Sequence, residues 1–386
     1  MLRYVLRRLL WMPLVLFVLI TLTFVLIRQA PGGPFSAERQ ASAEVVANLN
    51  AKYGLDRPAL EQFSRYLGFG FVRDDASTAW EPLRWRPHAG GGLISGDLGP
   101  SFKFKDRSVN EILGTGIGKT AILGGVATVL ALAIGLTAGV IGAVKRNSVF
   151  DYASMSVATF GMSVPNFVTG PVLILLFALT WKLLPVSGWD VTIAWTPLAV
   201  VAGLYAAWRI AEWARFGFGR TTLGREAGAF WLFALVLATT AAVTLLVKSP
   251  ALILPSVTLA LPFASRIARL MRAGMLEVIG QDYVRTARAK GLAETTVVIR
   301  HALKGGILPV VSYLGPAVAG ILTGSLVVER VFAVPSIGSE FVEAALSRDY
   351  LLVLGVVVLD GVLLVTFNLI VDVVYGFLDP RIRYDG

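Results

Sequence analysis

The chain lacks cysteine altogether, has only two histidines in 386 residues and is charged at only 16% of its positions. Without cysteine it can form neither a disulfide nor an iron-sulfur cluster nor a thiolate nucleophile, and His88 and His301 are too few for a His-rich zinc site. Soluble domains carry about 25% charged residues. The low charge, with 55% hydrophobic residues and a mean hydropathy of +0.70, therefore predicts a membrane protein.

Motifs for bond-breaking chemistry are also missing from the sequence. The segment Leu113–Thr120 approaches a phosphate-binding loop, but Leu113 stands where the first glycine should be, and the segment leads into an apolar run. A glycine-rich beginning of a helix is the simpler interpretation. No Ser-His pair and no pair of acids lies at a common depth in the apolar runs. We therefore expect no enzyme activity, no metal site and no cofactor in this chain.

An uncharged run of 19 residues extends from Leu9 to Ile27, close to the start of the sequence. At about 1.5 Å per residue, a helix of this length crosses the roughly 30 Å of a bilayer's hydrocarbon core. The run ends in Arg28 and Gln29 and not in a small-x-small cleavage site. Residues 1–28 are thus predicted to be a retained N-terminal anchor helix.

Further apolar runs indicate a polytopic protein. Five are long enough to cross a membrane, namely Thr120–Val144, Ala153–Leu179, Ile253–Met271, Leu308–Val328 and Leu352–Phe377. Two less clean runs, at 195–210 and 229–247, flank an arginine-rich link and predict an inserted helical hairpin over 191–248. We expect an all-α membrane protein with six core transmembrane helices and eight spans in all. The alternative is a hairpin that lies in the membrane interface without crossing it. The number of spans is then six, which is also even, so the predicted orientation does not change.

Basic residues indicate which side of the membrane faces the cytoplasm. With six or eight spans, the residues at 145–146, the link at 209–226, the stretch 266–304 and the tail at 381–383 all lie on the side of the N-terminus. The positive-inside rule makes that side cytoplasmic, so both termini are predicted to be cytoplasmic. We therefore interpret the net charge of +10 as a topology signal and expect no nucleic-acid partner.

The residues 29–119 form the one long segment predicted on the periplasmic side. Within it, Glu44–Leu67 has helical periodicity interrupted at Gly54–Pro58, which predicts a small helical cap. The Gly- and Pro-rich stretch Arg84–Pro100 predicts a loop. Residues 120–386 are then the transmembrane domain.

The stretch 266–304 holds eight basic and three acidic residues. Asp282 is placed to cap a short helix over Tyr283–Lys290, and Gly291 supplies a left-handed stop. A second helix is predicted over Glu294–Leu303. Small side chains at the tip of the first helix let a partner's backbone come close, and the flanking arginines offer bidentate contacts to acidic groups. The pattern predicts a docking surface for a soluble protein.

This stretch also carries a resemblance to a known family. The string from Gln281 to Leu292, QDYVRTARAKGL, followed by RHAL at 300–303 and Leu308-Pro309, resembles the coupling loop of the permeases of binding-protein-dependent ABC importers, in their dipeptide/oligopeptide/nickel form. The general motif of that superfamily is Glu-Ala-Ala, three residues, then Gly. Only Ala287 and Gly291 match it here, and the remainder is similar to the peptide branch. Other stretches agree, at 30–34, 95–101, 254–262 and 379–383.

The resemblance implies a permease subunit that performs no ATP hydrolysis itself. It implies a second homologous permease subunit, two ABC ATPase subunits or one fused ATPase to bind ATP and Mg, and an extracytoplasmic substrate-binding protein. It also implies a multi-pass location in the bacterial cytoplasmic (inner) membrane and a peptide substrate, either di- or oligopeptides or microcin C-like peptide conjugates. A permease for nickel or another small solute is the alternative within the family, and an ion-gradient-driven secondary transporter is the alternative outside it.

Two groups of residues are candidates for function. The cytoplasmic coupling loop, expected at 272–307, carries the residues implied in ATPase coupling: Asp282, Tyr283, Arg285, Thr286, Ala287, Arg288, Ala289, Lys290 and Gly291. Candidates for the translocation path lie inside the apolar runs: Pro165, Pro262, Asp360 and Asn368. An intramembrane acid is costly unless it is paired or hydrated, and a proline frees backbone carbonyls. Pairing within the bundle and kinks that serve packing are the alternatives.

Overall fold

The structure is a computed structural model that describes residues 2–29, 32–35, 43–68, 71–73, 80–82, 92–104, 106–189, 239–240, 242–243, 246 and 248–378. It divides into two compact units. Unit 1 comprises residues 1–120, 335–369 and 382–386, and unit 2 comprises residues 121–334 and 370–381. Most of the predicted hairpin at 191–248 lies outside the described residues.

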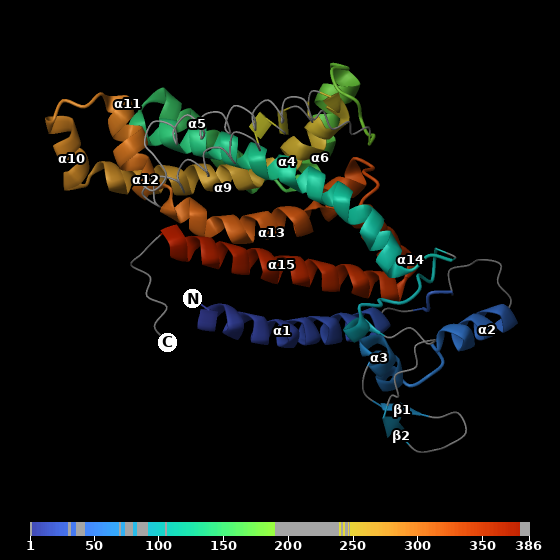
Figure 1. Cartoon of the computed structure of the whole chain (residues 1–386). Helices are drawn as coiled ribbons and strands as arrows, with labels where there is room; N and C mark the ends of the chain where they lie inside the picture. The colour runs from blue at the N-terminus through green and yellow to red at the C-terminus, as the bar shows by residue number, and fades with distance from the viewer. Residues whose placement is uncertain are drawn as a thin grey trace, which may run out of the picture. The chain divides into compact units, whose positions relative to one another are not determined.

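The described residues include five helices long and apolar enough to cross a membrane, or six if one bent pair counts as a span. The five are α1 (Leu2–Gln29), α4 (Val109–Val144), α9 (Ile253–Ile279), α13 (Leu308–Val331) and α15 (Tyr350–Leu378) (Figure 1). A helical, multi-span protein is thus confirmed. Helix α4 begins well before the expected Thr120, because the Ser108 hydroxyl accepts a hydrogen bond from the amide of Glu111 and caps an earlier start.

The run Ala153–Leu179, predicted as one span, is instead a broken pair. Helix α5 (Val149–Ser163) and the run of α6 (Asn166–Leu173) with the π-helical segment η2 (Ile174–Thr180) meet at 109°. Val164 is extended, with φ −92° and ψ 120°, as the residue before a proline prefers. Pro165 is the N-cap of α6 and is also extended, with ψ 146°, so the next helix begins only at Asn166. The prediction of a continuous span was wrong for this reason.

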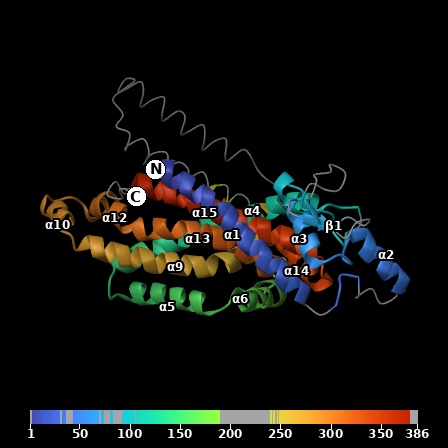
Figure 2. The same cartoon turned by 90° about the horizontal axis from the view of Figure 1, so that it is seen from below.

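Helix α9 is the centre of unit 2. It packs against α5, α6 and α13, and Figure 2 shows it between α13 and α5. The largest apolar core of the unit forms around it and includes Leu259, Ile267 and Met271, each at most 1% exposed. Burial of these side chains stabilises the bundle within the unit, whereas the exposed apolar side chains of α5 and α6 face away from its core.

An ion pair with a buried carboxylate fixes the beginning of α5 to α9. Arg272 donates two hydrogen bonds to Asp151, at 2.6 Å from Nε to Oδ1 and 2.7 Å from Nη2 to Oδ2. Asp151 is 2% exposed and also accepts the backbone N–H of Asn147 at 3.0 Å. The carboxylate is therefore satisfied by a bidentate guanidinium and an amide, as a buried charge must be.

Unit 1 contains the predicted helical cap. Helices α2 (Ala43–Tyr53) and α3 (Ala59–Leu67) stand on either side of the predicted break, so that prediction is confirmed. Two short antiparallel strands, β1 (Phe71–Arg73) and β2 (Trp80–Pro82), were not predicted. The described part of the expected loop contains one 3₁₀ turn, η1 (Leu93–Ser95). In the C-terminal part of the unit, the short helix α14 (Ile337–Ser347) precedes α15.

Asp349 attaches the segment before α4 to the beginning of α15. This carboxylate is fully buried and accepts hydrogen bonds from the Ser101 hydroxyl and from the backbone N–H groups of Phe102, at 3.0 Å, and Lys103, at 3.3 Å. Its other oxygen accepts the N–H of Leu352 at 3.2 Å, which caps the first turn of α15. One acid thus orders two segments that are about 250 residues apart in the sequence.

A second buried acid, Glu61, makes the cap sensitive to acid. Glu61 is 1% exposed and pairs with Arg57 at 2.7 Å and Arg65 at 2.9 Å. Burial opposes ionisation of Glu61, but the hydrogen bonds and charges of the two arginines outweigh it and hold its pKa below the usual value. A lowered folded-state pKa contributes stability above the ordinary pKa of about 4.3, and this stability is lost as the pH falls through the folded value.

We therefore expect the protection of the α3 amides against hydrogen exchange to decrease as the pH is lowered from 6 to below about 4, after correction for the intrinsic exchange rate. The matched variant Glu61→Gln keeps the shape but cannot titrate, so its protection should not change in that range. Equal pH dependence in the two proteins would contradict the assignment.

Candidate functional site

The short helix α10 (Asp282–Ala289) follows directly after α9 and forms the tip of the basic stretch (Figure 1). Its N-cap is Gln281, whose side chain makes no capping hydrogen bond. The expectation that Asp282 caps the helix was wrong, since Asp282 is the first helical residue. Its negative charge still stabilises the helix, because it lies at the positive end of the helix dipole. Its backbone carbonyl accepts a hydrogen bond from the Thr286 hydroxyl at 2.9 Å.

One face of α10 is buried and the opposite face is exposed to solvent. Val284, Ala287 and Val297 form a small buried core, with Val278 packed against it. This places the predicted coupling residue Ala287 inside the chain's own packing, at 4% exposure. The remaining predicted coupling residues are exposed along the other face: Asp282, Tyr283, Arg285, Thr286, Arg288, Ala289, Lys290 and Gly291. We call these eight residues the exposed face of α10.

Gly291 ends the helix as predicted. Its φ is +75°, and a Cβ built at this position would meet nothing within 4 Å. The position therefore needs glycine for its backbone conformation and not for space, because a left-handed φ strains residues that have a Cβ. The N–H of Gly291 closes the turn on the carbonyl of Arg288 at 2.9 Å.

An ion pair that the sequence did not predict braces this turn. Arg288 donates to both oxygens of Glu294, at 3.1 Å from Nε and 2.6 Å from Nη2. The hydrogen bonds from Arg288 hold the pKa of Glu294 below its usual value, and those to Glu294 raise the pKa of Arg288. The only sequence signal was an opposite charge six residues away across a glycine. Both side chains are more than a third exposed, so the pair sets geometry more than stability.

The second helix runs from Glu294 to Gly306 without a break and is longer than the predicted Glu294–Leu303. It consists of α11 (Glu294–Thr296), the π-helical η4 (Val297–Ala302) and α12 (Leu303–Gly306). Here α9 and α12 approach closely, because a Cβ added at Gly274 would lie 2.4 Å from the carbonyl oxygen of Gly306. Helix α13 begins two residues later and packs against α9. Both ends of the α10–α12 region are therefore attached to packed membrane helices.

Replacing Gly291 with alanine is expected to destabilise the turn by about 1–2 kcal/mol, because alanine must adopt a positive φ. Gly280 offers a matched control at the other end of α10. Its φ is −78°, and an added Cβ would meet atoms no nearer than 3.5 Å. Gly280→Ala should leave hydrogen exchange in 282–296 unchanged, whereas Gly291→Ala should accelerate it. Equal exchange in the two variants would contradict this interpretation of the turn.

The sequence matches two family descriptions that fit this arrangement. Residues 135–220 and 227–384 match "Binding-protein-dependent transport system inner membrane component", and residues 1–81 match the N-terminal part of the same transport-system membrane component. The chain belongs to this family. It is a multi-pass protein of the inner membrane.

Relatives of known role match along the whole chain. The chain is similar to the oligopeptide transport system permease protein OppB of Haemophilus influenzae, with 37% identity over all of both chains, and to that of Escherichia coli K12, with 38% identity over all of both chains. It is also similar to the dipeptide transport system permease protein DppB of Bacillus subtilis, with 35% identity over 99% of this chain and 98% of the relative.

In this permease the predicted path residues fall into the two units. Asp360 and Asn368 lie on the continuous helix α15, both half-buried, two turns apart on one face within unit 1. Pro165 stands at the break between α5 and α6, and Pro262 lies inside α9, both in unit 2. Inside α9, Pro262 leaves a backbone carbonyl without its helical partner, whereas Pro165 stands between two helices. A role for these four residues in translocation stays a prediction.

Proposed function

We propose that this permease is the membrane-spanning subunit of an ATP-driven importer of peptides. The observation that carries the proposal is the similarity, at 35–38% identity over nearly the whole length, to permeases of oligopeptide and dipeptide transport systems. The family is one of binding-protein-dependent transport systems, so an extracytoplasmic binding protein would deliver the peptide and ATPase subunits would supply the energy.

Besides the binding protein, the assembly that we propose has three kinds of component. This chain pairs with a second homologous permease subunit, and two ABC ATPase subunits, or one fused ATPase, bind ATP and Mg. Leu113–Thr120, the one segment with a likeness to a phosphate-binding loop, is part of the continuous helix α4, which supports this division of labour. We propose that the chain has six core spans plus the hairpin, with both termini in the cytoplasm.

The exposed face of α10 is proposed to be the contact with the ATPase. Its buried side is already used by Val284 and Ala287, whereas the opposite side presents the two arginines and the small side chains of Thr286 and Ala289. Closing of the ATPase pair would move α10, and α9 and α13 would transmit the movement because they are attached to both ends of the region.

Uptake by vesicles tests the proposed function directly. Vesicles that contain this chain and its co-expressed partners should accumulate a labelled tripeptide only with ATP and the binding protein, and nickel should not be transported. Accumulation driven by an ion gradient without ATP would favour a secondary transporter, and ATP-driven accumulation of nickel would favour the small-solute alternative.

A further inference from the structure

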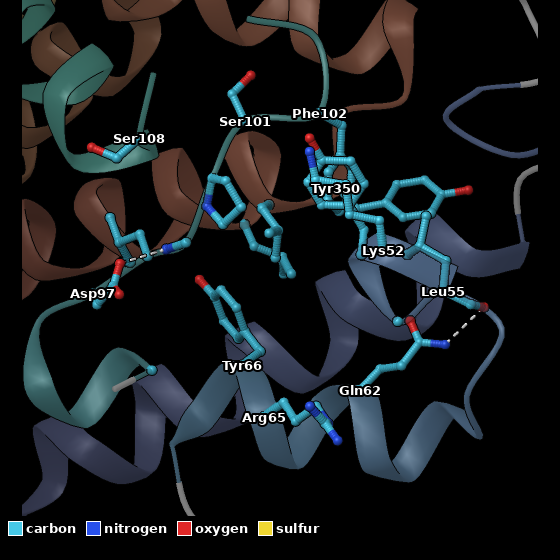
Figure 3. Close-up of a pocket in the computed structure, with 18 of the residues that line it drawn as sticks. Lys52, Leu55, Gln62, Arg65, Tyr66, Asp97, Ser101, Phe102, Ser108 and Tyr350 are labelled. Atoms are coloured by element: carbon cyan, nitrogen blue, oxygen red, sulfur yellow. Dashed lines mark hydrogen bonds between the residues drawn. The ribbon is translucent and has the colours of Figure 1, made fainter. Parts of the chain in front are cut away.

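Unit 1 contains a pocket of about 820 Å³, in the range of sites that bind small molecules, roughly 300–1,000 Å³. It lies where the last turns of α1, helices α2 and α3, the segment before α4 and the first turns of α15 meet (Figure 3). None of the residues proposed for coupling or translocation lines it. The pocket therefore needs an explanation of its own.

The hydroxyl of Tyr66 is a buried polar atom that the described part of the fold leaves unsatisfied. Tyr66 is only 6% exposed, its hydroxyl has no hydrogen-bond partner, and Figure 3 shows the oxygen pointing into the pocket. Burial raises the pKa of Tyr66, so the group is a neutral phenol with one proton to donate. An unpaired buried hydroxyl is destabilising, and a bound acceptor would relieve it.

Two cations of the same pocket also lack an anion among the described residues. Arg28 is half-buried, donates to the Gln62 side-chain oxygen and lies 4.5 Å over the ring of Phe24. Gln62 is itself held by the carbonyl of Leu55 at 3.1 Å, so the guanidinium has a fixed position. Lys52 is exposed, and its Nζ lies 5.5 Å from the centre of the Tyr53 ring. Other basic residues of the lining already have acidic partners: Arg57 and Arg65 with Glu61, and Arg107 with Glu111.

The end of the uncharged run of α1 indicates that the pocket lies near the level of lipid headgroups. Arg28 is the first charge after the uncharged run Leu9–Ile27, and cationic side chains at the end of a span reach the headgroup layer. Apolar side chains of the membrane helices, Ile27 and Leu354, line one part of the pocket. The same turns of α1 expose Leu22 at 57% and Leu26 at 66%. An apolar surface thus continues from the pocket along the membrane helix.

We propose that this pocket binds a glycerophospholipid, whose phosphate lies against Arg28, whose ester oxygens reach the Tyr66 hydroxyl and whose acyl chain follows the apolar side of α1. A guanidinium forms strong charge-assisted hydrogen bonds to phosphate oxygens, and the apolar side of α1 suits an acyl chain. Asp97 and Asp106 also line the pocket. A headgroup with an ammonium beyond the phosphate, such as ethanolamine, therefore fits better than one with a second phosphate.

Native mass spectrometry of the full-length chain, purified in a neutral detergent, tests this proposal. The probe is dioleoyl phosphatidylethanolamine, which should be retained at about one molecule per chain. Arg28→Gln should weaken retention roughly tenfold and Tyr66→Phe roughly threefold or more, as expected for the loss of a charged and a neutral hydrogen bond. Lys145→Gln, which removes an exposed cation of unit 2, is the control and should retain the lipid as the unchanged protein does.

Two further measurements on the unchanged protein show whether the pocket binds a phosphate as part of a lipid or as a free ion. Dioleoylglycerol, which has the acyl chains without the phosphate, should not be retained, and inorganic phosphate should not displace the bound lipid. Retention of dioleoylglycerol equal to that of the phospholipid would overturn the proposal, as would displacement by inorganic phosphate at millimolar concentration. Unchanged retention in both Arg28→Gln and Tyr66→Phe would also overturn it.

A thermal measurement distinguishes the lipid from a purely structural role of Tyr66. Without lipid, Tyr66→Phe should melt at the same or a higher temperature than the unchanged protein, because it removes an unpaired buried hydroxyl. Addition of lipid should raise the melting temperature of the unchanged protein more than that of Tyr66→Phe. A variant that melts lower in both conditions would show that the hydroxyl serves the fold alone.

Discussion

Asp151→Asn is expected to destabilise unit 2 by about 2–4 kcal/mol, because it removes the buried partner of an Arg272 guanidinium that is itself 27% exposed. The variant leaves the Arg272 guanidinium, which is held at 2.6 and 2.7 Å from the carboxylate, opposite a neutral amide that cannot accept both of its hydrogen bonds. It also weakens the contact with the Asn147 amide. The beginning of α5 should separate from α9, and thermal unfolding of the purified protein should occur at a clearly lower temperature.

Two controls show whether the effect comes from the pair. Asp282→Asn removes an aspartate whose side chain is 97% exposed and lies 3.6 Å from Arg285, so its effect on stability should be below about 0.5 kcal/mol. Replacing both partners, with Asp151→Leu and Arg272→Met, should recover much of the loss because no unpaired charge remains. A double variant no more stable than Asp151→Asn would indicate that the pair has another role.

The second large effect concerns the exposed face of α10. Ala289→Trp places a bulky side chain where a small one lets a partner's backbone approach, and it should reduce peptide uptake tenfold or more, the effect expected from the loss of a central contact of about 2 kcal/mol. Ala289 is exposed, so folding and membrane insertion should not change. The basal ATPase rate of the partners should persist, whereas its stimulation by the loaded binding protein should be lost.

The matched control places the same side chain elsewhere. Leu10 is 78% exposed on α1, next to Trp11, so Leu10→Trp adds an indole where the chain already has one. This variant should transport as well as the unchanged protein. Equal uptake by Ala289→Trp and Leu10→Trp would show that α10 makes no tight contact with a partner.

Helices and their ends could be predicted where a long apolar run meets charge or glycine. Helix α1 agrees with the predicted anchor at 1–28, and α15 agrees with the predicted run Leu352–Phe377 to within two residues. Gly291 ends α10, as its left-handed conformation requires. The break at Pro165 was missed because hydropathy averages over a run and contains no information on backbone direction. The signal was local, since Val164 precedes a proline and is restricted to extended backbone.

Contacts between distant segments could not be predicted in the same way. The pairing of Asp151 with Arg272 and the attachment of Asp349 to Ser101 join residues more than 100 positions apart, and one sequence does not say which of many charges will meet. The phospholipid pocket was even harder to predict, because its lining comes from three separate parts of the sequence: α1, the helical cap and α15. The Arg288–Glu294 ion pair could not be predicted either, because it depends on the geometry of the turn between the two residues.

The absence of cysteine from all 386 residues allows a direct test of the central claim, that α10 touches the ATPase from the cytoplasmic side. A single Ala289→Cys substitution, with a short bifunctional cross-linker in inverted membrane vesicles, should join the permease to an ATPase subunit, and the yield should change when ATP is added. Labelling of this cysteine from the periplasmic side of intact cells, or no cross-link to any other chain, would contradict the account.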